Sequence, residues 1–462
     1  MSELTHPAVP MRPVVEDSSS LAVWLTAADQ SLLFQRQAED LLFAEGVNEH
    51  PVLEVDAGRV YQPIEGFGFS LTGGSAMLVS RLPGADRSAL LRELFSSTGD
   101  GIGVSCLRLS IGASDLGERS FSYDDRPAGQ EDFELAYFDI EAGDPGTIPV
   151  LQAILAVNPA IKLIASAWSA PPWMKTNQSF IGGKLRPDCY AVYAAYLVKY
   201  LQAMREKGIA IQAMTVQNEP LNPHNEPSMV MEAGEQAEFV KRHLGPALEA
   251  AGLAEVELFC WDHNCDVKEY PLAVFADAEA RRYLAGSAWH LYGGDISALA
   301  EVHQAYPGMK LYFTEQWVGA DGQFAGDLHW HVRHVLVGSL RHWSRVVLEW
   351  NLASDPLCGP HTPGGAVGCV GALTLGQGIA RNVAYYVIAH AAKFVRPGSV
   401  RIYSDERAAL PNAAFRTPAG LIVLIALNDG GEPQSFNIRY QGKQAAATLP
   451  AGAVATYVWR AE

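Results

Sequence analysis

The chain has 462 residues, of which 48% are hydrophobic and 18% charged, a composition too apolar for a disordered protein. Its 34 basic and 51 acidic residues give a net charge of −17, which disfavours nucleic-acid partners. Six cysteines do not make a disulfide scaffold in a chain this long, and no apolar run approaches the ~18 residues of a membrane span.

The N-terminal residues 1–7, Met-Ser-Glu-Leu-Thr-His-Pro, lack the basic and apolar regions of a signal peptide. We therefore expect a soluble, cytoplasmic protein. Export of a longer precursor stays open as the alternative, and the sequence makes no prediction of the oligomeric state.

Short β-rich runs alternate with helical stretches through the middle of the chain. Several of the runs are continuously apolar, as is typical of parallel strands covered on both faces. The predicted strands are residues 65–70, 103–110, 162–168, 211–217, 256–262, 286–292, 310–315 and 346–351. The predicted helices are residues 147–157, 188–207, 232–251, 327–343 and 379–392.

Successive βα units of this kind favour a closed parallel barrel, because parallel neighbours need helical crossovers. An open doubly wound sheet is the rival, and a glycine-rich phosphate turn after the first strand would favour it. No G-x-G-x-x-G occurs there. The sequence thus predicts an α/β fold with a (β/α)₈ TIM barrel over residues 63–392.

The two ends of the chain differ from the middle. Residues 400–462 alternate apolar and polar side chains between turn signals such as Asn-Asp-Gly-Gly at 428–431. Shorter β-like runs lie at residues 21–25, 52–55 and 60–62. We expect both termini to meet in one discontinuous all-β sandwich domain, residues 1–62 and 393–462.

Chemistry in such a barrel lies at the C-terminal ends of the strands. Carboxylates, amides, imidazoles and aromatic rings follow the predicted strands, without a cofactor fingerprint. This mixture suits a sugar, because aromatic faces stack on C–H-rich ring faces while amides and carboxylates bind hydroxyls. The candidate residues here are Arg108, Asp115, Trp168, Asn218, Glu219, His263, His290, Tyr292, Glu315 and Trp350.

Cleavage of a glycosidic bond needs two carboxyl groups that flank it, and Glu219 and Glu315 end the fourth and seventh strands. Asn218, beside Glu219, could bind the 2-hydroxyl of the sugar. A single glutamate at a strand end is usually only solvated, whereas two across one barrel favour catalysis. Trp168 and Trp350, taken alone, are more often core or rim residues.

Metal sites are not predicted. Residues 262–266 have calcium-loop spacing at three positions, but Val267 stands where the required glycine should be. Cys260, His263 and Cys265 do not have a zinc spacing. Three histidines on one predicted helix do not share a face, so surface or packing roles are expected for His329, His331 and His334.

Taken together in chain order, these motifs resemble family 30 of the glycoside hydrolases. The matching segments are EGFG at 65–68, LRLSIGASD at 107–115, ASAWSAPPWMKTN at 165–177, TVQNEP at 215–220, AWHLY at 288–292, FTE at 313–315 and EWNLA at 349–353. The resemblance implies a barrel with a sandwich built from both termini, and retaining catalysis. It makes Glu219 the acid/base and Glu315 the nucleophile.

The resemblance also implies the residues that hold the non-reducing sugar. They are Asp115, Trp168, Asn218, His290, Tyr292 and Trp350. Arg108 is expected to support Glu315 by lowering its pKa through opposite charge.

This chain departs from the family pattern at three places near the substrate. Residues 69–76, FSLTGGSA, lack the acid of the G-G-A-x-T-D-A-A pattern. His263 stands in place of a glutamine, and His361 in place of an asparagine. The resemblance therefore leaves the substrate open.

We expect a retaining hydrolase that acts on β-glucosidic linkages, in a glucosylceramide-like glycolipid or an oligosaccharide, without metal or cofactor. Hydrolysis of β-1,6-glucan, β-xylosides or β-fucosides is the alternative within the family. A non-catalytic carbohydrate-binding protein is the alternative from another class, and the carboxyl pair argues against it, since binding alone does not need both groups. An interaction scaffold is a third and weaker possibility.

Overall fold

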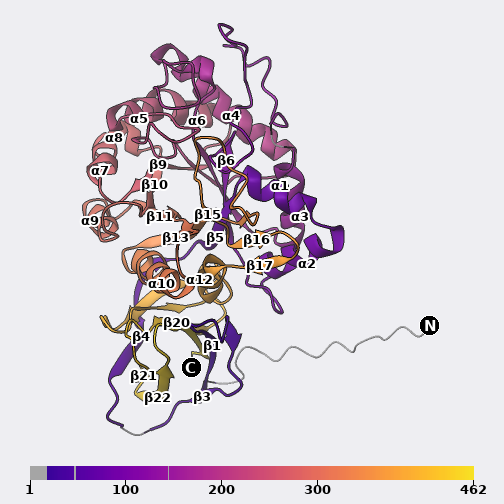
Figure 1. Cartoon of the computed structure of the whole chain (residues 1–462). Coiled ribbons are helices and arrows are strands. Elements are labelled where there is room, and N and C mark those ends of the chain that lie inside the picture. The colour runs from indigo at the N-terminus through magenta and orange to yellow at the C-terminus, as the bar shows by residue number, and fades with distance from the viewer. Residues whose placement is uncertain (1–17, 46–47, 144, 462) are drawn as a thin grey trace, which may run out of the picture.

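The computed structural model of the chain describes residues 18–45, 48–143 and 145–461. The expectation about residues 1–7, and the first 17 residues of the predicted sandwich range, lie outside these residues. Figure 1 shows a helix-covered barrel above a smaller all-β part, so the predicted fold class is confirmed.

Eight parallel strands close the barrel in the order β10-β11-β13-β5-β6-β7-β8-β9. Each strand except β8 is six to eight residues long and mostly buried, as the continuous apolar runs predicted. Their bounds are β5 (Gly66–Leu71), β6 (Cys106–Ile111), β7 (Lys162–Ala167), β8 (Ala213–Thr215), β9 (Glu257–Asn264), β10 (Leu284–His290), β11 (Lys310–Glu315) and β13 (Ser344–Asn351).

Helices cover the outside of the barrel (Figure 1). They are α1 (Gly73–Arg81), α2 (Gly84–Phe95), α3 (Thr147–Val157), α4 (Tyr190–Glu206), α5 (Ala233–Phe239), α6 (Gly245–Ala250), α7 (Glu269–Ala276), α8 (Ala278–Arg281), α9 (Ala298–Ala305), α10 (Phe324–Trp330), α11 (Ser339–Arg341) and α12 (Val383–Ala392). π-helical segments Val240–Leu244 and His331–Gly338 join α5 to α6 and α10 to α11. Among the described residues, no helix is both long and apolar enough to cross a membrane.

The side chains inside the barrel change from apolar to polar toward its mouth. Because successive strand residues point to opposite faces, every second residue points inward. On β7, Ile164 belongs to the apolar layer inside the barrel and Ser166 to the hydrogen-bonded layer above it. On β11, Tyr312 and Thr314 take the same two positions. This alternation places a polar layer beneath the ends of the strands.

Strands from both ends of the chain pair in one ten-stranded sheet, in the order β2-β1-β23-β20-β19-β18-β4-β21-β22 with β3 beside β1. The sheet folds around a single apolar core to which β1, β4 and the C-terminal strands all contribute. The strands are β1 (Ser20–Thr26), β2 (Gln35–Arg36), β3 (Leu41–Leu42), β4 (Val52–Pro63), β18 (Val400–Ser404), β19 (Asn412–Arg416), β20 (Leu421–Leu427), β21 (Gln434–Tyr440), β22 (Lys443–Leu449) and β23 (Val454–Arg460).

The last helix, α12, joins the barrel to the sandwich through His390. This side chain is fully buried, and its Nε2 and Nδ1 lie 2.8 Å from the hydroxyls of Thr26 on β1 and Thr456 on β23. No carboxylate contributes to its environment, and burial lowers the pKa of His390 to about 3. The interface therefore requires a neutral imidazole.

We expect the free energy of unfolding to fall as the pH is lowered from about 6.5 toward 3, because the unfolded histidine binds a proton there and the folded one does not. The His390→Gln variant should depend less steeply on pH in this window. Urea-unfolding midpoints measured between pH 7 and 4 would check this. Equal slopes for the variant and the wild type would contradict it.

The structure corrects several predicted boundaries. Residues 379–392 are not one helix: β17 (Ile379–Arg381) pairs with β16 (Leu373–Leu375) before α12 starts at Val383. The strand predicted over 103–110 starts at Cys106, because Gly103 has a positive φ. Helices α1, α2, α7, α8 and α9 lay outside the predicted elements, whereas β18 and β22 fall within the β-structure predicted over 400–462.

Candidate active site

Glu219 follows the shortest barrel strand, β8. After β8 ends at Thr215, the chain bends, and the backbone N–H groups of Asn218 and Glu219 donate to Ala167 O (2.8 Å) and Asp262 O (3.0 Å). Glu219 has a φ of +43°, which is rare for a residue with a Cβ and is often found at functional sites. These contacts hold the nearly buried carboxyl at the barrel mouth.

Glu315 ends β11 and is equally buried. Its Oε2 accepts a hydrogen bond from Arg108 Nη1 at 2.5 Å, and its Oε1 accepts one from the Tyr292 hydroxyl at 3.0 Å. Both carboxylate oxygens are therefore held by donors from two other strands or loops.

Arg108 lies fully buried at the centre of this arrangement. Its Nη2 donates to Asn218 Oδ1 at 2.6 Å and to Asp262 Oδ2 at 2.8 Å. Its guanidinium also lies over the Trp168 ring, 4.7 Å from the centroid, and Trp168 stacks on Trp350 at 5.3 Å. The guanidinium thus binds Glu315 directly. It also holds Asn218, the neighbour of Glu219, and Asp262, whose carbonyl accepts the N–H of Glu219.

Asp262 ends a predicted strand, but its role in the site was not predicted. Trp261 and Asp262 have positive φ values, and the register of β9 against β10 shifts here, so the strand carries a bulge. The bulge turns the buried Asp262 toward Arg108, Thr215 and Thr314. Although burial favours its neutral form, Arg108 and His290 hold the pKa of Asp262 well below its ordinary value.

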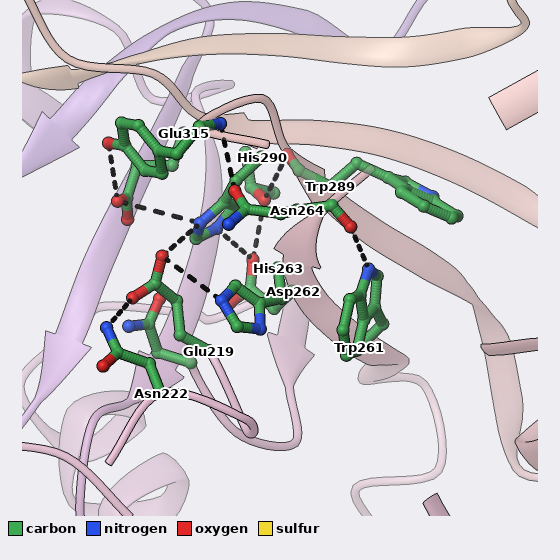
Figure 2. A network of polar contacts seen from close by, with 12 residues as sticks. Glu219, Asn222, Trp261, Asp262, His263, Asn264, Trp289, His290 and Glu315 are labelled. Carbon is green, nitrogen blue, oxygen red and sulfur yellow. Dashed lines mark hydrogen bonds and ion pairs between the residues drawn. The ribbon is translucent and has the colours of Figure 1, made fainter. Parts of the chain in front are cut away.

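His290 connects Asp262 to the glutamates (Figure 2). Its Nε2 lies 3.1 Å from Asp262 Oδ1, and its Nδ1 lies 3.3 Å from Glu219 Oε1 and 3.8 Å from Glu315 Oε1. Against the effect of burial, these carboxylates raise the pKa of His290 to about 9. The ring is therefore an imidazolium at neutral pH, with a donor facing each side.

The two glutamates differ in their electrostatic environment. Burial raises the pKa of Glu219, but the hydrogen bond and charge of His290, together with His263 and Asn222, outweigh it and hold the pKa at about 2. Burial also raises the pKa of Glu315, and here the opposing charges of His290 and Arg108 do not outweigh it. Arg108 acts on Glu315 in the expected direction, but its effect is smaller than that of desolvation.

Of the other predicted sugar-site residues, Asp115 and His263 lie near the glutamates, and His361 does not contact them. Asp115 is buried near both glutamates; burial and the charge of Glu315 raise its pKa to about 7, and its Oδ1 has no hydrogen-bond partner among the described residues. His263 is also nearly buried, with Nε2 3.9 Å from Glu219 Oε1. His361 lies on the loop after β14 (Ala353–Ser354), where its Nδ1 contacts Thr362 O at 2.8 Å, and no described contact joins it to the glutamates.

Asn222, which donates to Glu219 Oε2 at 2.8 Å, was not predicted. It follows Glu219 by three residues, and this turn spacing was the only available signal. The three helix histidines have packing or surface positions: buried His331 pairs with Glu349, partly exposed His329 with Asp429, and half-buried His334 packs on Trp330.

A metal ion could bind here only if His290 lost its proton and Glu315 left Arg108. One oxygen each of Glu219 and Glu315 and one nitrogen of His290 lie within 4.8 Å of one another. His290 would have to lose its proton to become a ligand, and Arg108 already holds Glu315. The arrangement is better suited to moving a proton between the carboxyl groups and a substrate.

Two nearly buried carboxyl groups at one barrel mouth, after β8 and at the end of β11, with oxygens within 4.8 Å of each other, define the class of glycoside hydrolases. Comparison with known proteins agrees. Residues 64–395 match the glycosyl hydrolase family 30 TIM-barrel domain, and residues 398–457 match the glycosyl hydrolase family 30 beta sandwich domain. The chain belongs to glycosyl hydrolase family 30 and is an O-glycosyl hydrolase.

Similar proteins are named for different activities. The endo-1,6-beta-D-glucanase neg1 of Aspergillus fumigatus is 32% identical over 86% of this chain and 85% of its own. The lysosomal acid glucosylceramidase of Mus musculus is 27% identical over 88% of this chain and 83% of its own. A solved endo-beta1,6-glucanase matches with a TM-score of 0.88 and 33% identity, over 96% of this chain and all of its own.

Proposed function

We propose that the protein hydrolyses β-glucosidic linkages with retention of configuration, with Glu315 as nucleophile and Glu219 as acid/base. The observation that carries the proposal is the spacing of the two carboxyl groups: one oxygen of Glu219 lies within 4.8 Å of one oxygen of Glu315. Retaining enzymes hold the two groups about 5–5.5 Å apart, whereas inverting enzymes leave about 6.5–9.5 Å for a water.

In the first step, ionised Glu315 attacks the anomeric carbon as the bond to the leaving oxygen breaks. Glu219 gives its proton to that oxygen, and a glycosyl ester of Glu315 forms. In the second step, Glu219 takes a proton from water, whose oxygen attacks the same carbon and releases Glu315.

The proton for the first step comes from the hydrogen bond between His290 and Glu219. In the free enzyme His290 Nδ1 carries it, 3.3 Å from Glu219 Oε1. A sugar that covers the site removes the remaining water and disfavours a separated carboxylate and imidazolium, so that the proton moves to Glu219. Arg108 and the Tyr292 hydroxyl remain on Glu315 and favour its ionised form.

The sugar-binding residues are proposed from their position around the pair. Arg108 occupies Asn218 Oδ1, so Asn218 presents its Nδ2 to the 2-hydroxyl. The unpartnered Oδ1 of Asp115 is an acceptor for another hydroxyl. Trp168 and Trp350 form the apolar wall beside the sugar ring, and His263 lies on the leaving-group side, next to Glu219.

Two kinds of β-glucoside are candidates. The relatives named endo-1,6-glucanases share 32–34% identity with this chain, and those named glucosylceramidases share 27–28%. The difference supports testing a β-1,6-linked glucan first and glucosylceramide second. β-Xylosides and β-fucosides remain the alternatives for the sugar itself.

We expect turnover of aryl β-glucosides and of at least one of these two natural substrates. Product sizes from β-1,6-glucan over time separate internal cleavage from release of single glucose units, and proton NMR of the first product gives its configuration. A first product of inverted configuration would exclude the retaining mechanism. Binding of the sugars without any turnover would favour the carbohydrate-binding alternative.

A further inference from the structure

Glu226 connects three active-site loops without touching the catalytic pair. It lies on the loop after β8, and its Oε1 accepts a hydrogen bond from Ser120 Oγ (3.3 Å) on the loop after β6. Its Oε2 accepts one from the backbone N–H of Gly364 (2.9 Å), and its carbonyl accepts one from Thr362 Oγ1 (2.5 Å), both on the loop after β14. We call Ser120, Glu226, Thr362 and Gly364 the three-loop contact.

The three-loop contact lies directly against Asp115. The backbone N–H of Thr362, a fully buried residue, donates to Asp115 O at 2.8 Å. The loop is so close that a Cβ on Gly365 would stand 2.4 Å from that same oxygen. Asn225, the neighbour of Glu226, lies beside the Asp115 side chain and opposes the rise in its pKa. The backbone of Asp115 is thus held by the loop after β14, its side chain faces the loop after β8, and Glu226 joins these two loops.

The loop after β14 is held by individual contacts, without regular secondary structure. Residues 355–368 contain no helix or strand, and Leu357 and Val367 are 87% and 68% exposed. A half-buried carboxylate that accepts a backbone N–H is a stronger anchor than a contact between exposed side chains. Without it, the N–H of Gly364 and the hydroxyl of Ser120 would turn to water, and the loop would be held less firmly beside Asp115, through the hydrogen bonds of Thr362.

We propose that Glu226 is a positioning residue that sets sugar affinity by holding Asp115 against the substrate. The inference rests on the proposed function, in which Asp115 binds a sugar hydroxyl. Glu226 acts only through Asp115, so its loss weakens the grip on the sugar in the ground state and in the transition state alike. It is therefore expected to change KM more than kcat.

The test is a double-mutant cycle with an aryl β-glucoside as substrate. Glu226→Ala should lower kcat/KM about tenfold, mainly by raising KM, and Glu226→Gln, which keeps one acceptor oxygen, should lower it less. In the Asp115→Ala background, the same Glu226→Ala change should cost less than about twofold, because no side chain is left to position. A Ser120→Ala variant removes one partner of Glu226 while leaving the carboxylate, and should give a small change in the same direction.

Glu118→Gln is the matched control. It lies on the same loop as Ser120, pairs with Arg81 across an exposed surface at 3.5 Å, and should leave KM unchanged. The inference would be overturned if the losses of kcat/KM caused by Glu226→Ala and Asp115→Ala multiplied in the double variant. An unchanged KM in Glu226→Ala would also overturn it. An inactive Glu315→Ala in the same assay would show that the proposed function survives this outcome, whereas an active one would remove both.

Discussion

Replacing Glu315 by alanine should abolish turnover of every β-glycoside that the wild-type enzyme cleaves, with a fall in kcat of about 10⁴-fold or more. The reason is that no other described carboxylate is placed to replace it. Asp262 lies deeper, bound to Arg108; in the proposed mechanism Glu219 protonates the leaving oxygen and Asp115 binds a sugar hydroxyl. Initial rates on an aryl β-glucoside would measure the loss.

Azide distinguishes a missing nucleophile from a damaged site. In Glu315→Ala, azide fits the space of the lost carboxylate and attacks from its side, so activity should return with an α-glycosyl azide as product. In the companion variant Glu219→Ala, a substrate with a good leaving group should still form the ester. Azide should then open that ester from the opposite face to give the β-glycosyl azide.

The two products provide the control for each other, because the roles predict opposite configurations. If the α-azide came from Glu219→Ala and the β-azide from Glu315→Ala, the two assignments would be exchanged. If Glu315→Ala kept its activity without azide, the residue could not be the nucleophile. Circular dichroism of both variants should match the wild type, since each change only shortens a side chain at the barrel mouth.

Residue patterns predicted the barrel well because a parallel strand that is covered on both faces leaves a strong signal. The run at 162–168 and the run at 310–315 both became buried barrel strands with bounds within a residue of those predicted. Glu315 then follows from its place at the end of its strand. Short helices such as α8 carry too few turns for a periodic pattern, and they were missed.

The parts of the site that the sequence did not predict depend on irregular backbone. Simple alternation from Phe259, which points inward, would put Trp261 inside the barrel and Asp262 outside it. The bulge at these two residues reverses that order, and no residue type in the run signals it. The same limit applies to Glu226, whose partners lie 106 and 138 positions away along the chain.

The predicted effect of Arg108 on Glu315 was incomplete for a related reason. Opposite charge could be read from the sequence, but the extent of burial could not. Desolvation has the largest effect on the pKa of Glu315, and the charge of His290 lowers this pKa more than the charge of Arg108 does. The charge state of the site therefore belongs to the whole network and to no single pair.

Replacing Arg108 by methionine should destabilise the fold by about 3–5 kcal/mol and leave no measurable turnover. The side chain is fully buried, and its removal leaves Asp262 and Glu315 without their cation and Asn218 without its donor. Two buried carboxylates, with only His290 to balance them, must then either take up a proton or disrupt the barrel mouth. Arg108→Lys keeps the charge, but a single ammonium group cannot reach all three acceptors, so it should fold yet turn over at least about tenfold more slowly.

Arg345 provides the matched control at the other end of the barrel. It pairs with Glu65 at 3.5 Å and is 24% exposed, so Arg345→Met should cost about 1 kcal/mol or less and leave kcat unchanged. Chemical unfolding and aryl β-glucoside kinetics on the three variants would measure both quantities. Equal stability losses at Arg108 and Arg345 would mean that water compensates the buried carboxylates, and full activity of Arg108→Lys would mean that charge alone, without the fork, organises the site.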